Sequence, residues 1–457
     1  MNRIFISAAH KSSGKTTVGI GLAAALARRE LRVATFKKGP DYIDSIWLGI
    51  ASGAPTWNLD FFTTPINEIV TCFDRESQGS DVAIIEGNKG LHDGLDTKGS
   101  DSSAALANLL ECSVVLVLDV TGITRSVAAI VEGYNNLEPH SNIIGIILNK
   151  IGGSRHEVKL RAALKHYTDI PILGAIRRSN DIQIQEEHIG LIPGNEHQAA
   201  LHTIEVLADQ IEANVDIDTL LELSNDGQVK SVSNQPEITS HRDIRVGIAR
   251  DAAFNFYYPD DLRAFGQAGV ELVEIDTLVD SCLPSIDGLF IGGGFPERFA
   301  QPLHDNESLR HDIQNFVKDD GPVYAECGGL MYLSESISWR GDRYGMVGAV
   351  RASAIMSSRP VGRGYVSFCP TVKHPWPGMA ARSEQELHGH EFHYSKLENI
   401  DPDMARAWDM KRGYGIDGMT DGIVHHNLLG AYLHQRNVGG NLWVESFVDF
   451  VRQCRST

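Results

Sequence analysis

At its start the chain carries a lysine-bearing loop between a short apolar strand and a helix, an arrangement that few folds contain. Residues Arg3–Ser7 form the apolar segment, the loop Ala9–Thr17 reads AHKSSGKTT, and the pattern over Thr16–Arg29 is helical. The loop matches GxxxxGK[ST], except that Ala9 replaces the first glycine. A chance SGKTT at a helix start is the alternative, but the position between strand and helix favours a phosphate-binding loop.

The residue types in this loop indicate how a nucleotide would be held. Backbone N–H groups of such a loop, together with the helix N-terminus, bind phosphates. We expect the Lys15 ammonium to reach the β- and γ-phosphates of ATP and the Thr16 hydroxyl to face Mg²⁺. The predicted nucleotide-binding residues are Ser12, Ser13, Gly14, Lys15, Thr16 and Thr17.

Strands and helices alternate through the first half of the chain. Further apolar runs predict buried strands at Val82–Glu86, Val114–Asp119, Ile143–Asn149 and Pro171–Ala175, and the pattern over Thr124–Leu137 is helical. Alternation at this spacing predicts an α/β fold with a doubly wound parallel sheet. Ligands of such sheets bind beyond the carboxyl ends of the strands.

A change of composition divides the chain. Residues 211–243 are polar and acidic, contain Asn-Asp-Gly and a proline, and predict a linker. A second α/β region opens at Arg245–Ala249, and its later segments have the pattern of antiparallel strands. We therefore expect a nucleotide-binding domain over 1–210, a linker over 211–243 and a second domain over 244–457.

Acidic side chains follow two of the predicted strands. Asp41 and Asp44 come after a strand that ends at Phe36, and Glu86 ends an apolar strand before a glycine-rich loop. Carboxylates at such positions hold Mg²⁺ directly or through water. The predicted metal ligands are Thr16, Asp41 and Glu86; the alternative for the two aspartates is a turn or helix-cap role.

Two residues at the ends of later strands indicate a function less specifically. Asn149 closes the strand in ILNKIGG and is predicted to donate to the adenine edge, although an ordinary loop asparagine is the alternative. Asp119 also ends a strand, where an aspartate commonly caps the next helix.

Charge and cysteine usage exclude several classes of partner. The 457 residues include 41 basic and 59 acidic side chains, for a net charge of −18. That field repels nucleic acid and anionic membranes, and no apolar run reaches the ~18 residues that span a bilayer. The six cysteines are scattered without CxxC pairs, which predicts free thiols and a cytoplasmic location.

One cysteine has a chemical context. Cys327 follows the predicted strand Pro322–Glu326 and precedes a helix, in the motif AECGGLMYL. A helix N-terminus lowers a thiol pKa, so we expect a thiolate nucleophile on a sharp turn. Gly293 and Gly294 follow another strand and are predicted to form an oxyanion hole, and His434 is predicted as the general base.

The histidine-rich segment Leu387–Tyr394 allows a metal site as an alternative. His388, His390 and His393 lie there beside Glu391. In a strand, however, His393 falls on the opposite face from the other two histidines, and no further ligand lies at zinc spacing.

Together, the motifs resemble the cobyrinic acid a,c-diamide synthase family. The resemblance extends from Ile4 to about Phe450 and is carried, in this order, by SSGKTTV, FKKGPDYID, NLDFF, EGNKGLHDG, RDAAFNFYYPDDL, GGGFPE, AECGGLMYL, GHEFHYS and AYLHQR. It implies an ATP-dependent synthetase domain similar to dethiobiotin synthetase, followed by a class I glutaminase-like α/β domain. It also implies amidation of tetrapyrrole carboxylates with ATP and L-glutamine as the other substrates.

The resemblance assigns roles to residues of this sequence. Asp41, Asp44 and Glu86 match the acidic positions around ATP, Mg²⁺ and the acceptor carboxylate. Cys327 matches the glutaminase nucleophile and His434 its base. Many class I glutaminases carry a glutamate two residues after the histidine; here Arg436 takes that place, so a Cys–His dyad is expected.

Departures from the family pattern leave the identity of the tetrapyrrole substrate undecided. His10 and Lys11 stand in the phosphate loop, His92 replaces a usual aromatic residue, and Gln435 precedes Arg436. Cobyrinate is the first choice of substrate, and siroheme or a sirohydrochlorin is the second. Two further hypotheses are a nucleotide-driven binding switch and a non-catalytic relative, and homodimer formation stays open.

Overall fold

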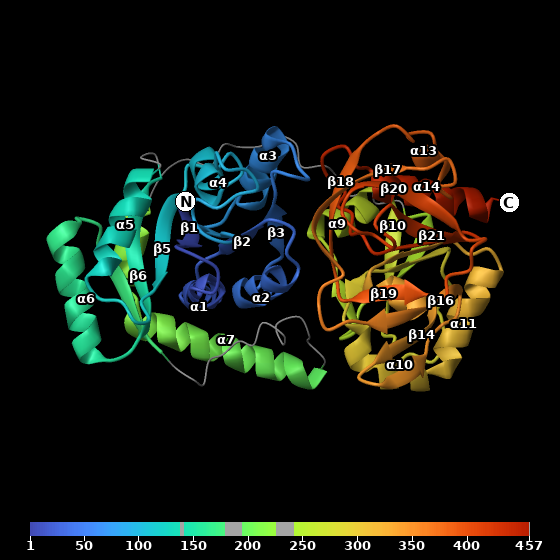
Figure 1. Ribbon diagram of the computed structural model, residues 1–457, viewed down its shortest axis with the longest axis horizontal. Helices are drawn as coiled ribbons and strands as arrows, with labels where there is room; N and C mark the ends of the chain where they lie inside the picture. The colour runs from blue at the N-terminus through green and yellow to red at the C-terminus, as the bar shows by residue number, and fades with distance from the viewer. Residues whose placement is uncertain (138–140, 179–193, 225–241, 457) are drawn as a thin grey trace. The chain divides into compact units, whose positions relative to one another are not determined.

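A computed structural model describes the chain except for residues 138–140, 179–193, 225–241 and 457 (Figure 1). The described residues form two compact units, an N-terminal unit with β1–β7 and α1–α8 and a C-terminal unit with β8–β22 and α9–α14. Within the described ranges, no helix combines the length and apolar character needed to cross a membrane.

The N-terminal unit is built on seven parallel strands in the order β3-β2-β4-β1-β5-β6-β7. The strands are β1 (Asn2–Ala8), β2 (Val33–Lys38), β3 (Thr56–Leu59), β4 (Val82–Glu86), β5 (Ser113–Asp119), β6 (Ile143–Ile151) and β7 (Ile172–Arg177). The predicted doubly wound sheet is confirmed. The chain order reverses on either side of β1, so the loop after β1 lies at the switch point where ligands bind.

Helices cover both faces of this sheet because side chains alternate along each buried strand. In β1, Ile4 and Ile6 face one core and Phe5 faces the other. The first core is covered by α1 (Lys15–Arg28), α2 (Ile43–Ser52), α7 (Gly194–Asn214) and α8 (Ile217–Leu223). The second is covered by α3 (Ile66–Glu76), α4 (Ser103–Leu109), α5 (Ser126–Leu137) and α6 (Ser154–Tyr167).

The first part of the predicted linker belongs to the N-terminal unit. Residues 211–214 end α7 and residues 217–223 form α8, and Ile211, Ile217 and Leu220 are buried in the core of this unit. The acidic residues that suggested a linker lie on the solvent side of these helices, as on any amphipathic helix. The rest of the predicted linker, 225–241, falls outside the described residues.

The C-terminal unit contains a nine-stranded sheet in the order β10-β8-β11-β13-β22-β21-β20-β17-β18. Its parallel part is β10 (Val270–Ile275), β8 (Ile244–Ala249), β11 (Gly288–Ile291), β13 (Val323–Glu326) and β22 (Leu428–Ala431). Its antiparallel part is β21 (Thr420–His425), β20 (Ala405–Arg412), β17 (Gly362–Pro370) and β18 (Leu387–His393). The predicted change from parallel to antiparallel strands is therefore present.

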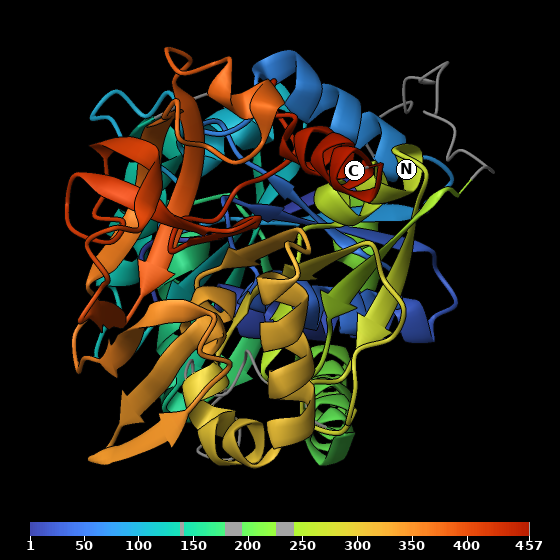
Figure 2. The ribbon, with the colours of Figure 1, turned by 90° about the vertical axis from the view of Figure 1, so that its right-hand side faces the viewer.

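Two small sheets and a set of helices complete this unit (Figure 2). The strands are β9 (Phe254–Phe256) with β12 (Gly293–Gly294), and β14 (Ser334–Trp339), β15 (Asp342–Gly345), β16 (Val350–Met356) and β19 (Ser395–Glu398). One face of the large sheet packs on α9 (Pro259–Gln267), α13 (Pro377–Ala380) and α14 (Trp443–Arg455). The other packs on α10 (Ala300–Asp305), α11 (Glu307–Lys318) and α12 (Gly328–Leu333), next to the 3₁₀ turn Pro296–Phe299.

Candidate active sites

The phosphate loop connects β1 to α1 through a turn that requires glycine. Gly14 has φ of 95°, in the left-handed region. A Cβ atom at this position would lie 2.1 Å from the Nδ2 atom of Asn149. Lys15 follows as the first residue of α1 and is buried, whereas Ser12 is exposed and Thr17 is half-buried. Burial lowers the pKa of Lys15, and attraction to Glu86 opposes that shift.

Neighbouring strands brace this loop from the side. The Asn149 amide donates to the Ser13 carbonyl oxygen at 2.9 Å. Lys150 donates to the Ser12 carbonyl oxygen at 2.8 Å and pairs with Asp119, also at 2.8 Å. The structure thus gives Asn149 a role in holding the loop, and its contact with adenine stays a prediction.

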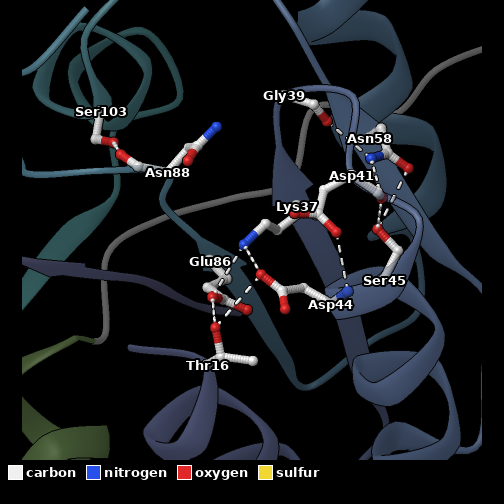
Figure 3. A network of polar contacts seen from close by, with 10 residues as sticks. All are labelled: Thr16, Lys37, Gly39, Asp41, Asp44, Ser45, Asn58, Glu86, Asn88 and Ser103. Atoms are coloured by element: carbon white, nitrogen blue, oxygen red, sulfur yellow. Dashed lines mark hydrogen bonds and ion pairs between the residues drawn. The ribbon is translucent and has the colours of Figure 1, made fainter. Parts of the chain in front are cut away.

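Four side chains meet beside the loop and form the cluster Thr16–Lys37–Asp44–Glu86 (Figure 3). The Thr16 hydroxyl donates to Glu86 at 2.6 Å and lies 3.3 Å from Asp44. The Lys37 ammonium lies 2.5 Å from Asp44 and 3.0 Å from Glu86. Of the predicted metal ligands Thr16, Asp41 and Glu86, the structure brings Thr16 and Glu86 together, and Asp44 is the aspartate that lies beside them. The loop after β1 and the ends of β2 and β4 meet because these strands are neighbours in the sheet.

Lys37 is the member of this cluster that the sequence analysis missed. It lies in β2 with only 2% of its surface exposed. Burial alone would lower the pKa of Lys37, but attraction to Asp44 and Glu86 outweighs it and raises the pKa. Burial raises the pKa of Glu86 to about 7, although Lys37 opposes the shift. A lysine at the end of a buried strand, seven residues before an aspartate, was the available signal.

The cluster suits a small hard cation. Oxygen ligands from one or two carboxylates, completed by phosphates, are what Mg²⁺ takes in nucleotide sites. Glu86 is fully buried, and its Oε2 atom has no hydrogen-bond partner in the described part of the chain. An ionised oxygen in that state costs free energy unless a cation or donor reaches it. The residues present therefore fit Mg²⁺.

Asp41 is placed differently from the other predicted acidic residues. Its carboxylate accepts a hydrogen bond from the Asp44 amide at 2.9 Å, at the start of α2. Burial, together with repulsion from Asp44, raises the pKa of Asp41 to about 6. Its observed contact is thus the helix-capping alternative, and a contact with metal stays a prediction.

In the C-terminal unit, Cys327 forms a sharp turn between β13 and α12. Its φ of 47° and ψ of −99° lie in a region that L residues rarely adopt. A Cβ atom at Gly329 would lie 2.3 Å from the Ile291 carbonyl oxygen, so only glycine fits there. Strained nucleophiles on strand–helix turns are held in this way.

The predicted oxyanion and base residues lie beside this turn. A Cβ atom at Gly293 would lie 2.6 Å from the Cε1 atom of His434. A Cβ atom at Gly328, next to the nucleophile, would lie 3.1 Å from the Gly294 nitrogen. The structure therefore brings together Cys327, which follows β13, His434, which lies beyond the end of β22, and the two glycines of β12.

The expected low pKa of the thiol is not observed. Burial raises the pKa of Cys327, and the nearby carboxylates of Glu297 and Glu326 raise it further. Burial and these carboxylates together outweigh the backbone hydrogen bond of Gly328, which lowers the pKa of the thiol. The thiol is therefore protonated in the free protein, and forming the thiolate needs a base.

His434 has a partner that the sequence analysis did not expect. Its Nδ1 atom lies 3.2 Å from Glu326 Oε2. The His390 ring stacks on the His434 ring, with centroids 4.8 Å apart. His393 stacks instead on Tyr432, and no group of three acidic, histidine or cysteine side chains in the described ranges is arranged to hold a metal. Of the three histidines in this segment, His390 is therefore the one that contacts His434.

Comparison with known families gives two matches, one for each part of the chain that contains a candidate site. Residues 4–192 match the CobQ/CobB/MinD/ParA nucleotide binding domain, and residues 245–439 match the CobB/CobQ-like glutamine amidotransferase domain. The protein thus belongs to the class in which a nucleotide-binding domain is joined to a glutamine amidotransferase.

Full-length relatives narrow the class. A cobyrinate a,c-diamide synthase from Magnetococcus marinus is 44% identical over 99% of this chain and 97% of that protein. Proteins of the same name from Archaeoglobus fulgidus and Methanosarcina barkeri are 38% and 36% identical, over 94% and 100% of this chain and 93% and 97% of their own lengths. The chain belongs to the cobyrinate a,c-diamide synthase family, as its motifs indicated.

Proposed function

We propose that this protein amidates the a- and c-carboxylates of cobyrinate with ATP and glutamine. The observation that supports the proposal is the presence, in one chain of this family, of two sets of groups with the chemistry that the reaction needs. One is a phosphate loop with the Thr16–Lys37–Asp44–Glu86 cluster, and the other is the Cys327 turn with His434. We assign the synthetase to the N-terminal unit, which includes α7 and α8, and the glutaminase to the C-terminal unit.

The synthetase activates a poor electrophile. A carboxylate repels an amine, and transfer of the γ-phosphoryl group of ATP converts it to an acyl phosphate with ADP as the leaving group. Lys15 and the loop amides stabilise the charge that spreads over the phosphoryl oxygens. Thr16 and Glu86, with Asp41 or Asp44, would hold Mg²⁺, and the bound cation would supply positive charge to neutralise the phosphates. Lys37 fixes the two carboxylates Asp44 and Glu86 by its ammonium.

The glutaminase supplies ammonia. His434 takes the thiol proton of Cys327 as sulfur attacks the glutamine side-chain carbonyl, and the oxyanion forms beside Gly293 and Gly294. The C–N bond then breaks, and ammonia leaves with the proton returned by His434. Water hydrolyses the remaining γ-glutamyl thioester to glutamate. Ammonia displaces phosphate from the acyl phosphate and yields the amide.

The compartment follows from the substrate and the thiols. ATP is an intracellular substrate, and all six cysteines are free, one of them exposed. We place the reaction in the cytoplasm, where thiols stay reduced.

The identity of the ring is tested by competition. With ATP and glutamine, we expect amidation of cobyrinate, and no amidation of siroheme present at equal concentration, as followed by mass spectrometry. Two residues that depart from the family pattern, and that suggested siroheme, make hydrogen bonds within the protein. His92 bonds the Tyr134 carbonyl oxygen at 3.0 Å, and the Gln435 side chain bonds the Tyr324 hydroxyl at 2.8 Å. Turnover of siroheme alone would contradict the assignment.

Replacing Glu86 by glutamine is expected to lower ATP-dependent amidation at least about tenfold and to raise the Mg²⁺ concentration for half-maximal rate. The amide keeps the size of the side chain and removes the charge beside Thr16 and Lys37. Glutamine hydrolysis should stay at the wild-type rate. Glu205→Gln, an exposed change on α7, is the control. An unchanged Mg²⁺ dependence would return Glu86 to a structural role.

A further inference from the structure

We propose that Glu326, the residue before the nucleophile, is the positioning residue that orients His434 as the base; the inference rests on the proposed glutaminase reaction. It replaces the expected Cys–His dyad by a Cys–His–Glu arrangement. The carboxylate and the nucleophile are then consecutive residues of the chain.

The usual sequence position for such a carboxylate is occupied by an arginine in this protein. Two residues after His434 stands Arg436, whose guanidinium lies 2.6 Å from Asp260 and 4.8 Å from the centre of the Tyr258 ring. A guanidinium has only donors and cannot accept a hydrogen bond from an imidazole. An acceptor for His434 must therefore come from another element.

Strand β13 supplies it through the alternation of its side chains. Tyr324 packs into the core under α9 and α14, whereas Ala325 packs into the core on the other face. Glu326 shares the face of Tyr324, and the hydroxyl of Tyr324 donates to Glu326 Oε1 at 2.7 Å. Cys327 then turns the chain, so the thiol and the carboxylate leave the strand end in different directions.

The Glu326 carboxylate is held so that one oxygen is left for His434. Only 2% of Glu326 is exposed. Oε1 accepts from the Tyr324 hydroxyl and from the Gln435 amide at 3.0 Å, while Oε2 lies 3.2 Å from His434 Nδ1. Gln435 also donates from its side chain to the Tyr324 hydroxyl at 2.8 Å. Glu326 therefore has a fixed position rather than a choice of conformers.

This contact decides which nitrogen of His434 carries the proton. An ionised carboxylate only accepts hydrogen bonds, so Nδ1 is the protonated nitrogen and the Nε2 lone pair is available to take the thiol proton. His390 stacks on the face of the ring, and Gly293 leaves room at its Cε1 edge. The arrangement performs the task of the aspartate in a Ser–His–Asp triad.

The test is Glu326→Gln, with Glu391→Gln as the matched control. Glu391 is equally buried at 2% and accepts from the Tyr414 and Gly415 amides. For Glu326→Gln we expect kcat of glutamine hydrolysis to fall about 10²-fold or more, with KM for glutamine unchanged. Amidation with ammonium salts should stay at the wild-type rate. In protein labelled with ¹⁵N-histidine, the His434 signal, assigned through His434→Ala, should report an Nδ1–H tautomer in the wild type and a changed tautomer in Glu326→Gln.

Each outcome of these experiments either supports or overturns the role proposed for Glu326. Wild-type glutamine kcat in Glu326→Gln, an equal loss in Glu391→Gln, or an Nε2–H tautomer in the wild type would overturn the proposal. The wild-type tautomer decides even if Glu326→Gln fails to fold. Glutamine hydrolysis is measured without a tetrapyrrole, so failure to amidate cobyrinate would remove the proposed function and leave the result for Glu326 intact.

Discussion

Replacement of Cys327 by alanine is expected to abolish glutamine-supported amidation and to leave ammonia-supported amidation intact. Loss of a catalytic nucleophile lowers kcat by orders of magnitude, and we expect a fall of about 10⁴-fold or more with glutamine. The synthetase needs only free ammonia, whatever its source, so ammonium salts at raised pH should restore the rate. The measurement is ADP release and amide formation with each nitrogen source.

Cys369→Ala is the matched control, because Cys369 is also a buried thiol of the C-terminal unit. It should use glutamine normally. If Cys327→Ala still uses glutamine, the nucleophile is another residue. If the folded variant also loses the ammonia reaction, a shared ammonia intermediate is wrong.

Lys15→Ala should have the complementary effect. In the proposed synthetase reaction the Lys15 ammonium reaches the transferred phosphoryl oxygens, and loss of such a cation lowers phosphoryl transfer by about 10³-fold or more. Amidation should disappear with glutamine and with ammonia alike, while glutamine hydrolysis persists. The protein should stay folded, because the burial of Lys15 already disfavours its charge.

Lys11→Ala tests whether any positive charge in the loop suffices. Lys11 is exposed four residues before Lys15 and should be dispensable. Near-normal amidation in Lys15→Ala, measured as ADP formed per amide, would remove the phosphate-loop assignment.

The order of the elements was predictable, because it depends on local patterns. Apolar runs of strand length and the loop before Lys15 define the N-terminal sheet, and the glycines around Cys327 define the turn after β13. β3 was not predicted, since four residues, Thr56–Leu59, are too few for a periodic signal. The end of the N-terminal unit was missed because the helices after residue 210 are polar on their outer side.

The partners of the reactive residues were not predictable, because they depend on which strands are neighbours. Lys37 joins Glu86 only because β2 pairs with β4. Glu326 reaches His434 only because β13 pairs with β22, and the sequence position two residues after His434 holds Arg436 rather than a carboxylate. The raised pKa of the Cys327 thiol likewise depends on the whole fold, since burial raises it most and the carboxylates of Glu297 and Glu326 raise it further.

The position of the nucleophile also bears on how the protein withstands oxidants. Peroxides attack thiolates, and Cys327 is protonated in the free protein and 6% exposed. In the proposed glutaminase reaction, its sulfur becomes a thiolate only when His434 takes the thiol proton during attack on bound glutamine. Between turnovers the active cysteine is thereby kept in its least oxidisable form, and the exposed Cys282 is the thiol that an oxidant meets first.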